Sequence, residues 1–223
     1  MAEPSRAAAE LAGRTRLPPG RHGLPRDVVA ESQRERLLNG VVEAVAAHGF
    51  GETTIGQITD AARISRRTFY EHFANKQECF LAAYEMIDAH VHGATAAAGE
   101  EAAAWPELVR DRLAALLETL ARDPAVARFY LVEPLAAGGE IAARYRDAMQ
   151  LLAATIRPRE ARADIDVEVR DQVLMGGLAG LIARRLKAGE ASRLPELLPD
   201  LAELVLAPYL GRAEARRVAR GDL

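Results

Sequence analysis

The sequence predicts an all-α protein, and three observations support this fold class. The chain has 223 residues, of which 49% are hydrophobic and only 5% aromatic, and its abundant alanine favours helices over sheets. Apolar residues recur at helical spacing along nearly the whole chain. Few segments alternate with a period of two, and no run of valine or isoleucine is bounded by turn residues as strands are. We therefore expect helices throughout.

Residues 1–26 differ in composition from the rest of the chain. The stretch from Pro18 to Gly20 and Pro25 interrupt any helix, so we expect a flexible arm. Five arginines against two glutamates make this arm positive. Basic arms can lie along phosphates or enter a minor groove, and Arg21 and Arg26 are the expected contacts. A solvated tail without a role is the alternative.

The first ordered helix is predicted over residues 27–48. Its inward-facing residues are expected to be Leu38, Val41, Val42 and Val45. Gly49 and Gly51 are expected to end it. This helix should complete a head of three helices.

A second, shorter helix is predicted from Thr54 to Ala62. Thr54 and Gln57 have the spacing of a capping box, in which the hydroxyl accepts from the Gln57 backbone and the Gln57 side chain reaches back. Ile55, Ile58 and Ala62 recur at helical spacing and can pack inward. A helix of about two turns is not stable alone, so it needs neighbours.

A third helix is predicted to follow a cap at Ser65. Phe69 and Phe73 lie four residues apart on one face and should hold the small bundle together. The opposite face carries hydrogen-bond donors and almost no apolar bulk; its residues are Arg66, Arg67, Thr68, Tyr70 and His72. Glu71 can pair with Arg67 at a spacing of four.

The next helix is predicted to begin after Asn75, which forms a second capping-box pattern with Glu78. Lys76 would lie in its first turn. Its apolar stripe consists of Phe80, Tyr84, Ile87 and Val91. Cys79 lies beside this stripe, so we expect a buried structural thiol, with a redox sensor as the alternative.

The chemistry of these helices suits a duplex of DNA. The N-terminal residues of a recognition helix reach base edges, and arginines such as Arg66 and Arg67 can make paired hydrogen bonds to guanine. The donors expected at phosphates, or at the helix N-terminus beside them, are Thr54, Ser65, Thr68, Tyr70, His72 and Lys76. Two adjacent arginines are more often ordinary solvent-exposed residues than DNA contacts. The flanking caps and turn favour a DNA contact here.

Local charge agrees with this interpretation although the formal net charge of the whole chain is −3. Between Arg63 and Lys76 the basic residues outnumber Glu71, the one acid there, while the chain beyond Leu81 carries the acidic excess. A positive head on an acidic body suits a sequence-specific DNA binder. Chance clustering is the alternative.

The run SRRTFYEHFANKQECF, together with the ordered caps and turn of residues 30–90, resembles the DNA-binding domain of the TetR/AcrR family of transcriptional regulators. That family usually has glycine in the turn between its two short helices, whereas this chain has Arg63. A non-glycine residue with positive φ carries a steric cost. We therefore expect a slightly altered turn, in which Arg63 itself can reach a phosphate.

The resemblance implies a head of three helices, a long connector and about five more helices. It also implies an effector cavity among the middle helices and a dimer interface made by the last two helices of each subunit. The expected domains are a flexible basic arm (1–26), a DNA-binding domain (27–90, helix-turn-helix about 54–73), an effector-binding and dimerisation domain (91–212) and a tail (213–223).

Two apolar stripes near the C-terminus fit the implied dimer interface. The stripe between Val167 and Ala188 includes glycines that allow helices to approach closely, and Pro199 is tolerable only in the first turn of the final helix. The candidate interface residues are Val173, Leu174, Gly177, Leu178, Leu181, Leu201, Leu204 and Val205. Burial within the monomer is the alternative.

Ligand pockets are mainly apolar with a few polar groups. The candidate pocket residues are Trp105, Leu116, Leu120, Phe129, Tyr130, Tyr145, Met149 and Met175, and plain core is the alternative for each. An apolar or aromatic small molecule is the expected ligand. Arg128 or Arg144 would meet its carboxylate, if it has one.

No enzyme motif is present: the chain lacks HExxH, a Walker loop, GxSxG and a paired CxxC. Asp88 and His92 share a helix face, but two residues are a poor metal site. We expect no catalysis, no cofactor and no metal. No run approaches the roughly eighteen apolar residues of a membrane helix, and the N-terminus lacks a secretory signal, so we expect a soluble, cytoplasmic protein.

These observations together predict a homodimeric repressor that binds a partly palindromic double-stranded DNA operator and is released by a small-molecule effector. The alternative is a helical ligand-binding or protein-interaction module with an unused helix-turn-helix. A helical enzyme without a recognisable motif is a third class.

Overall fold

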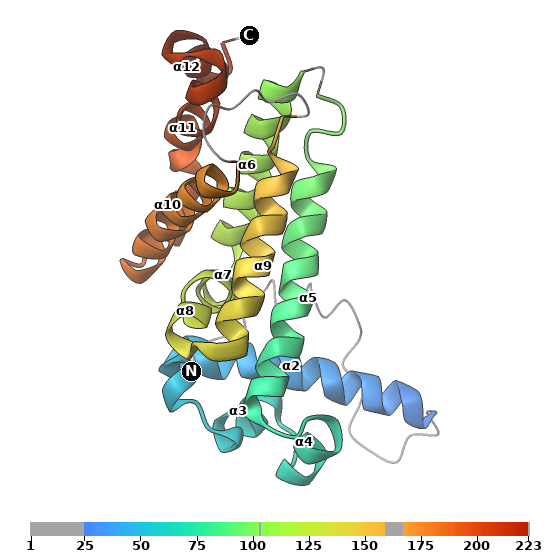
Figure 1. The fold of residues 1–223 in the computed structure, drawn as a ribbon. Coiled ribbons are helices and arrows are strands. Elements are labelled where there is room, and N and C mark those ends of the chain that lie inside the picture. The colour runs from blue at the N-terminus through green and yellow to red at the C-terminus, as the bar shows by residue number, and fades with distance from the viewer. Residues whose placement is uncertain (1–24, 103, 159–166, 223) are drawn as a thin grey trace. The chain divides into compact units, whose positions relative to one another are not determined.

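The computed structural model describes residues 25–102, 104–158 and 167–222, and in these ranges it contains helices and no strands (Figure 1). The predicted all-α fold class is confirmed. The described residues divide into two compact units, with the boundary between Met86 and Ile87. Within the described ranges no helix combines the length and apolar character needed to span a bilayer.

The first unit holds three helices and the start of a fourth. They are α2 (Arg26–Glu52), α3 (Ile55–Ala62), α4 (Arg66–His72) and the first half of α5 (Lys76–Ala97), drawn from blue to green in Figure 1. The predicted inward residues of α2, namely Leu38, Val41, Val42 and Val45, are all buried. Burial of this apolar stripe against the short helices stabilises helices that could not form alone.

The end of α2 follows the prediction at Gly49 but not at Gly51. Gly49 has φ 77° and ψ 156°, so the regular helix breaks there, and a short helical turn that includes Gly51 extends to Glu52. The Thr53 hydroxyl donates to the carbonyl oxygen of Gly49 at 2.7 Å, and the Thr53 N–H donates to the same oxygen at 3.1 Å. These two bonds satisfy the Gly49 carbonyl at the end of the short turn.

The start of α2 bears on the predicted arm. Arg26 is the first residue of α2 rather than part of an arm, and Arg21 lies outside the described residues.

A close approach holds α2 against α3. At Gly40 an added Cβ would lie 2.8 Å from the carbonyl oxygen of Ile58 and 2.9 Å from the Cβ of Ala62. Real Cβ atoms do not come this close to a neighbouring backbone, so only glycine allows this crossing.

The second unit contains the rest of α5 and a series of shorter helices: α6 (Trp105–Arg122), α7 (Pro124–Leu131), α8 (Glu133–Ala137), α9 (Gly139–Thr155), α10 (Val167–Lys187), η1 (Ala191–Leu197), α11 (Leu198–Leu210) and α12 (Arg212–Arg220). The described residues thus hold more than the five helices expected after the connector. Pro124, Pro134 and Pro199 all stand in first turns, where a missing N–H costs nothing.

The expected C-terminal tail is wrong for most of its length. Residues 213–220 belong to α12, whose Ala215, Val218 and Ala219 are buried. These three residues recur at spacings of three and one on a single face, and α12 packs on α11 and α6. Exposed arginines surround this narrow stripe, so its apolar side is hard to recognise in the sequence.

Candidate DNA-binding site and effector cavity

The first short helix of the head, α3, begins as predicted. The Gln57 N–H donates to the Thr54 hydroxyl at 3.3 Å, and the Thr54 N–H donates to the Gln57 side-chain oxygen at 2.8 Å. This reciprocal pair is the predicted capping box, and it satisfies two donors that the helix leaves open. Thr54 is exposed, so its side chain stays at the surface of the head.

The turn between α3 and α4 is built around Arg63. Arg63 has φ 54° and ψ 47°, and among the described residues it alone is a non-glycine with positive φ. The turn therefore keeps the left-handed geometry that glycine usually supplies, at a steric cost. The Arg36 guanidinium, from α2, donates to the carbonyl oxygens of Ala62 at 2.7 Å and Arg63 at 2.5 Å. Arg36 thus closes the open C-terminal end of α3.

The second short helix, α4, is also capped as predicted. The Ser65 hydroxyl accepts from the Thr68 N–H at 3.1 Å and lies 3.0 Å from the Thr68 hydroxyl. Phe69 and Phe73 are buried with ring centroids 5.9 Å apart, which confirms that they hold the bundle. These contacts fix the rotation of α4 and therefore which of its side chains face solvent.

The exposed face of α4 carries Arg66, Arg67 and Tyr70. Arg67 Nε donates to Glu71 Oε1 at 3.2 Å, so the predicted pair is confirmed, and both partners are open to solvent. Such a surface pair contributes little to stability. The Arg66 side chain lies against Gly56 of α3, because a Cβ added at Gly56 would lie 2.7 Å from Arg66 Nη2. The two arginines and Tyr70, whose exposed fraction is 58%, form a largely polar surface that is open to solvent.

Two other candidate contacts are engaged within the head. His72 Nε2 lies 3.3 Å from Gln33 Oε1. Lys76 Nζ donates to the carbonyl oxygens of Phe50, Gly51 and Thr53, at 2.7, 3.0 and 2.8 Å. These three bonds use every N–H of the ammonium group. Lys76 therefore ties the start of α5 to the end of α2, and the predicted phosphate contact would require it to release these carbonyls.

The start of α5 follows the predicted cap with one change of partner. The Glu78 N–H donates to Asn75 Oδ1 at 2.9 Å, but the Glu78 carboxylate accepts from the Ala74 N–H at 2.7 Å instead of from Asn75. Cys79 is fully buried, and burial raises the pKa of its thiol to about 12. A thiol that stays protonated at neutral pH is inert, which agrees with the structural role predicted.

Comparison with known proteins agrees with this geometry. The family model for the bacterial regulatory proteins of the tetR family matches residues 37–83, which run from α2 into α5. Over 186 residues the chain is 26% identical to the HTH-type transcriptional repressor AcnR of Corynebacterium efficiens, and the match covers 77% of this chain and 91% of AcnR. The chain belongs to the TetR family.

Two further relatives show how the TetR-family likeness is distributed. The chain is 36% identical over 74 residues to the HTH-type transcriptional regulator TcmR of Streptomyces glaucescens, which is 33% of this chain and 32% of TcmR. The solved structure of a TetR-like transcriptional regulator from Rhodococcus sp. RHA1 matches this chain with a TM-score of 0.59 at 24% identity. The match covers 82% of this chain and 97% of the Rhodococcus chain. This TetR-family chain is therefore a DNA-binding transcriptional regulator with the family's helical fold.

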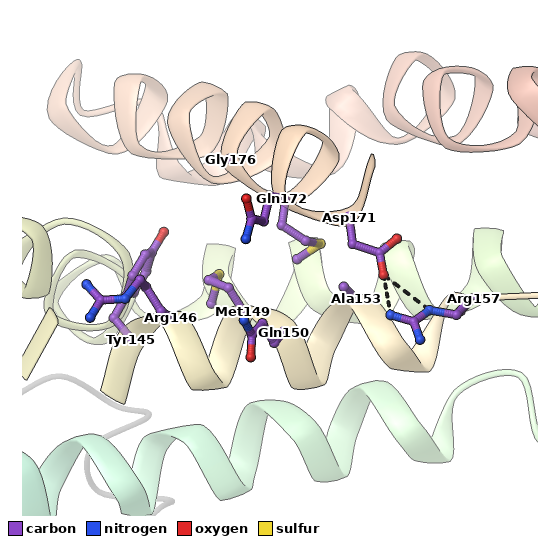
Figure 2. A pocket seen from close by; sticks show the side chains of 10 residues that line it. Tyr145, Arg146, Met149, Gln150, Ala153, Arg157, Asp171, Gln172 and Gly176 are labelled. Carbon is purple, nitrogen blue, oxygen red and sulfur yellow. Dashed lines mark hydrogen bonds and ion pairs between the residues drawn. The ribbon is translucent and has the colours of Figure 1, made fainter. Parts of the chain in front are cut away.

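The second unit of the TetR-family chain contains a cavity of about 710 Å³ between α9 and α10 (Figure 2). Its lining residues are Tyr145, Arg146, Met149, Gln150, Ala153, Arg157, Asp171, Gln172, Met175 and Gly176. Three of the eight sequence candidates, Tyr145, Met149 and Met175, are among them. A cavity of this size lies within the usual range for small-molecule sites.

The other five pocket candidates lie elsewhere. Leu116, Leu120, Phe129 and Tyr130 are buried and do not line the cavity. The Trp105 ring packs edge-on against Tyr209, with centroids 5.0 Å apart, and its Nε1 donates to the carbonyl oxygen of Ile156 at 3.1 Å. Helical periodicity marks inward-facing residues, but it does not separate those that pack from those that border a hollow.

The charged end of the cavity was missed by sequence reasoning. Asp171 Oδ2 accepts from Arg157, and Asp171 Oδ1 accepts from Arg170 Nη2 at 2.9 Å. Figure 2 shows the Arg157–Asp171 pair at one end of the cavity and Tyr145 with Arg146 at the other. Residues 157 and 171 are too far apart in sequence for any local pattern to pair them.

The two arginines predicted to meet a ligand carboxylate instead face carboxylates of the chain. Arg144 Nη2 lies 3.9 Å from Asp88 Oδ2, and Arg128 Nη2 lies 3.8 Å from Glu133 Oε1. The buried Asp88 also accepts from Tyr130 Oη at 2.8 Å, and its Oδ1 lies 3.0 Å from His92 Nδ1. This polar cluster explains Asp88 and His92 without a metal, and the described residues hold no group of three or more potential metal ligands.

The cluster shifts the pKa values of both titratable partners. Burial raises the pKa of Asp88, but hydrogen bonds from His92 and Tyr130 and the charges of His92 and Arg144 outweigh it, so the Asp88 pKa lies below its ordinary value. The hydrogen bond to the Asp88 carboxylate raises the pKa of His92, and burial opposes it only in part.

The predicted dimer residues fall into three groups. Leu178, Leu201 and Val205 are buried within the chain, so they belong to its own core and cannot add area to an interface. Leu174 and Leu181 are half-buried. Val173, Gly177 and Leu204 are exposed, with exposed fractions of 69% for Val173 and 52% for Leu204.

Proposed function

We propose that this regulator is a repressor that binds a partly palindromic operator as a homodimer and leaves it when a small molecule occupies the cavity between α9 and α10. The observation that carries the proposal is the exposed face of α4, where Arg66 and Arg67 stand on a helix fixed by caps and buried aromatics. The likeness to the repressor AcnR over 91% of its length supports repression as the direction of control.

On DNA, α4 would lie in the major groove with Arg66 and Arg67 at base edges. Thr54, Ser65 and Tyr70 are exposed around this face and are proposed to donate to phosphates, together with Thr68 and His72. Lys76 contributes by holding the start of α5 against α2.

Dimerisation is proposed to use the exposed side of α10 and α11. Val173 and Leu204 are large apolar residues open to solvent there, and Gly176, Gly177 and Gly180 on α10 have no heavy atom within 4 Å of an added Cβ. A surface of this kind lets two helices approach closely. Two heads in one dimer would read half-sites about one helical turn of DNA apart.

Release by an effector is proposed to be a population shift. An effector that binds the DNA-incompetent state more tightly draws the dimer off its operator, by no more than its difference in affinity for the two states. The cavity is the proposed effector site because residues of α9 and α10 form most of its lining and its middle is mainly apolar. The proposed location of this activity is the cytoplasm.

The test is selection of binding sites from random duplex DNA, made with the wild-type protein and with a double variant, Arg66→Ala with Arg67→Ala. We expect the wild type to enrich an inverted repeat and the double variant to lose it. Arg193→Ala is the matched control, since this exposed arginine lies in the second unit, 3.0 Å from Glu196. Sequence-blind binding by the wild type would favour the alternative, a helical interaction module with an unused helix-turn-helix.

A further inference from the structure

We propose that the effector is an amphipathic anion whose acidic group binds the guanidinium groups of Arg157 and Arg170 and whose apolar body lies along Met149 and Met175. This inference rests on the proposed effector role of the cavity and names the chemical class of its ligand. It is carried by the charges, contacts and burial at the end of the cavity where α10 begins.

The charged end of the cavity has an unbalanced charge. Two guanidinium groups, those of Arg157 and Arg170, share one carboxylate, that of Asp171. Counted over the described residues, the cluster of Arg157, Arg170 and Asp171 is therefore positive by one charge. An anionic ligand group would neutralise it, whereas a cationic ligand would meet repulsion from it.

Arg170 is the residue most in need of a further partner. Its exposed fraction is 8%, its Nε and Nη2 donate to Asp171 Oδ1 at 3.2 and 2.9 Å, and its Nη1 is buried with no hydrogen-bond partner in the described part of the chain. A buried donor on a charged group without an acceptor is costly. An anion that accepts from Nη1 would remove this cost, which gives the bound state a specific gain.

Asp171 connects this guanidinium to the cavity. A small hollow lined by Arg170 shares Ala153, Arg157, Asp171 and Met175 with the larger cavity. A ligand that reaches the end of the cavity therefore meets Arg157 and Asp171 first and Arg170 behind them. Planar guanidinium groups bind carboxylates and phosphates through paired hydrogen bonds, so a ligand anion competes with Asp171 for these donors.

Tyr209 fixes Arg170 in this position. The Arg170 guanidinium carbon lies 5.1 Å from the centre of the Tyr209 ring, and the same ring packs against Trp105. Trp105 is the one tryptophan of the chain, so its fluorescence is a reporter next to the proposed anion site.

The middle of the cavity suits an apolar body. Met149 and Met175 come from α9 and α10 and both line the cavity. Figure 2 shows Met149 and Ala153 on the α9 side. Methionine side chains adapt to differently shaped apolar ligands. Arg146, at the far end, is exposed, and an ion pair in water adds little affinity.

The test uses matched probes that differ in charge but not in body: decanoate against decanamide and decylamine, and 4-phenylbutanoate against 4-phenylbutanamide. Binding is followed by Trp105 fluorescence and by calorimetry, without DNA. We expect at least one acid to bind at least tenfold more tightly than its amide, and decylamine to bind more weakly than decanamide. Decyl phosphate separates a preference for phosphate from one for carboxylate.

Variants locate the anion. Arg170→Gln and Arg157→Gln should each abolish the preference for the acid over the amide, while Arg146→Gln, the matched control at the other end, should leave it unchanged. Asp171→Asn retains both arginines and removes the competing carboxylate, so it should tighten acid binding severalfold. Asp171→Asn also tests the proposal if either arginine variant fails to fold.

Equal affinity for each acid and its amide in the wild type would overturn the proposal, as would an acid preference lost in Arg146→Gln and kept in Arg170→Gln. Operator binding without ligand is measured separately. If the protein binds an inverted repeat but shows no preference for the acids, the proposed regulator stands and the anionic effector is refuted. If it prefers the acids but binds no specific operator, the anionic ligand stands and the proposed regulator is refuted.

Discussion

At the residue scale, the turn of the helix-turn-helix places Arg63 at φ 54°, a conformation that carries a steric cost for any residue but glycine. The lack of glycine between α3 and α4 predicts a slightly altered turn, whereas the observed turn keeps the left-handed geometry. The partner that supports the turn was not predictable. Arg36 reaches the carbonyls of Ala62 and Arg63 from 26 and 27 residues away, and no spacing rule pairs residues so distant in sequence.

Replacing Arg63 with glycine should stabilise the protein. Glycine adopts positive φ without the steric cost that arginine pays, so we expect the free energy of unfolding to rise by about 1 kcal/mol. The measurement is the midpoint of urea unfolding. Arg63→Ala is the control, since it removes the same side chain but keeps the Cβ. Equal stability of the glycine and alanine variants would show that the turn stores no strain.

Gly56 should control how Arg66 is presented. Because an added Cβ there would lie 2.7 Å from Arg66 Nη2, Gly56→Ala is expected to displace the guanidinium and leave the fold intact. If Arg66 reads a base, operator affinity should fall about tenfold. Gly51→Ala, at a site with nothing within 4 Å, is the control for a methyl group added to the head. Unchanged operator affinity in Gly56→Ala would argue against a base contact by Arg66.

At the element scale, helix starts were predicted better than helix ends. The caps at Thr54, Ser65 and Asn75 are local patterns, and all three are confirmed because capping depends on residues within one turn. Gly51 and the segment after Gly211 were misjudged: Gly51 lies in a short helical turn that continues to Glu52, and packing against α11 and α6 forms α12.

The crossing of α2 and α3 should tolerate no side chain at Gly40. An added Cβ would overlap the carbonyl oxygen of Ile58, and the two helices would have to separate. We expect Gly40→Ala to lower the free energy of unfolding by about 1–3 kcal/mol, as overpacked cores do. Thermal unfolding followed by circular dichroism measures this. The control is Gly93→Ala in α5, where nothing lies within 4 Å and alanine favours the helix. An equal response of the two variants would contradict the close approach.

At the scale of the whole molecule, the helix-turn-helix and the helical segments after it are predictable from sequence, but the cavity in the second unit is not. Cavity walls are set by how α9 and α10 pack, and the residues that define its charged end are Arg157, Arg170 and Asp171. Periodicity found Tyr145, Met149 and Met175 because they face inward. It equally selected buried core residues such as Phe129, which no helical pattern could distinguish from them.

The stability of the protein should depend on pH through Asp88 and His92. The folded pKa of Asp88 is lowered from 3.8, so its contribution is present above that value and is lost as pH falls through the folded pKa. The folded pKa of His92 is raised from 6.5, so its contribution is present below that value and is lost as pH rises through the folded pKa. We expect the cluster to stabilise the fold most between about pH 4 and 6.5.

Urea unfolding at a series of pH values measures this profile. In His92→Gln the free energy of unfolding should no longer fall as pH rises above about 6.5, because glutamine does not titrate. Its fall at acid pH should be smaller but should remain. The control is His90→Gln, which makes the same substitution at an exposed histidine of the same helix. A wild-type profile that is flat from pH 6 to 8 would show that His92 gains no stabilisation from Asp88.

The proposed dimer involves the whole molecule, because a single DNA-binding domain contacts only one half-site of a palindromic operator. Val173→Asp and Leu204→Glu place charges on side chains that are already more than half exposed, so neither should unfold the monomer. Light scattering should show each variant as a monomer, since a dimer interface would bury these charges without partners. Operator affinity should fall with the dimer. Leu151→Glu, equally exposed at 55% but on α9, should change neither property, and a dimer that survives both interface charges would place the interface elsewhere.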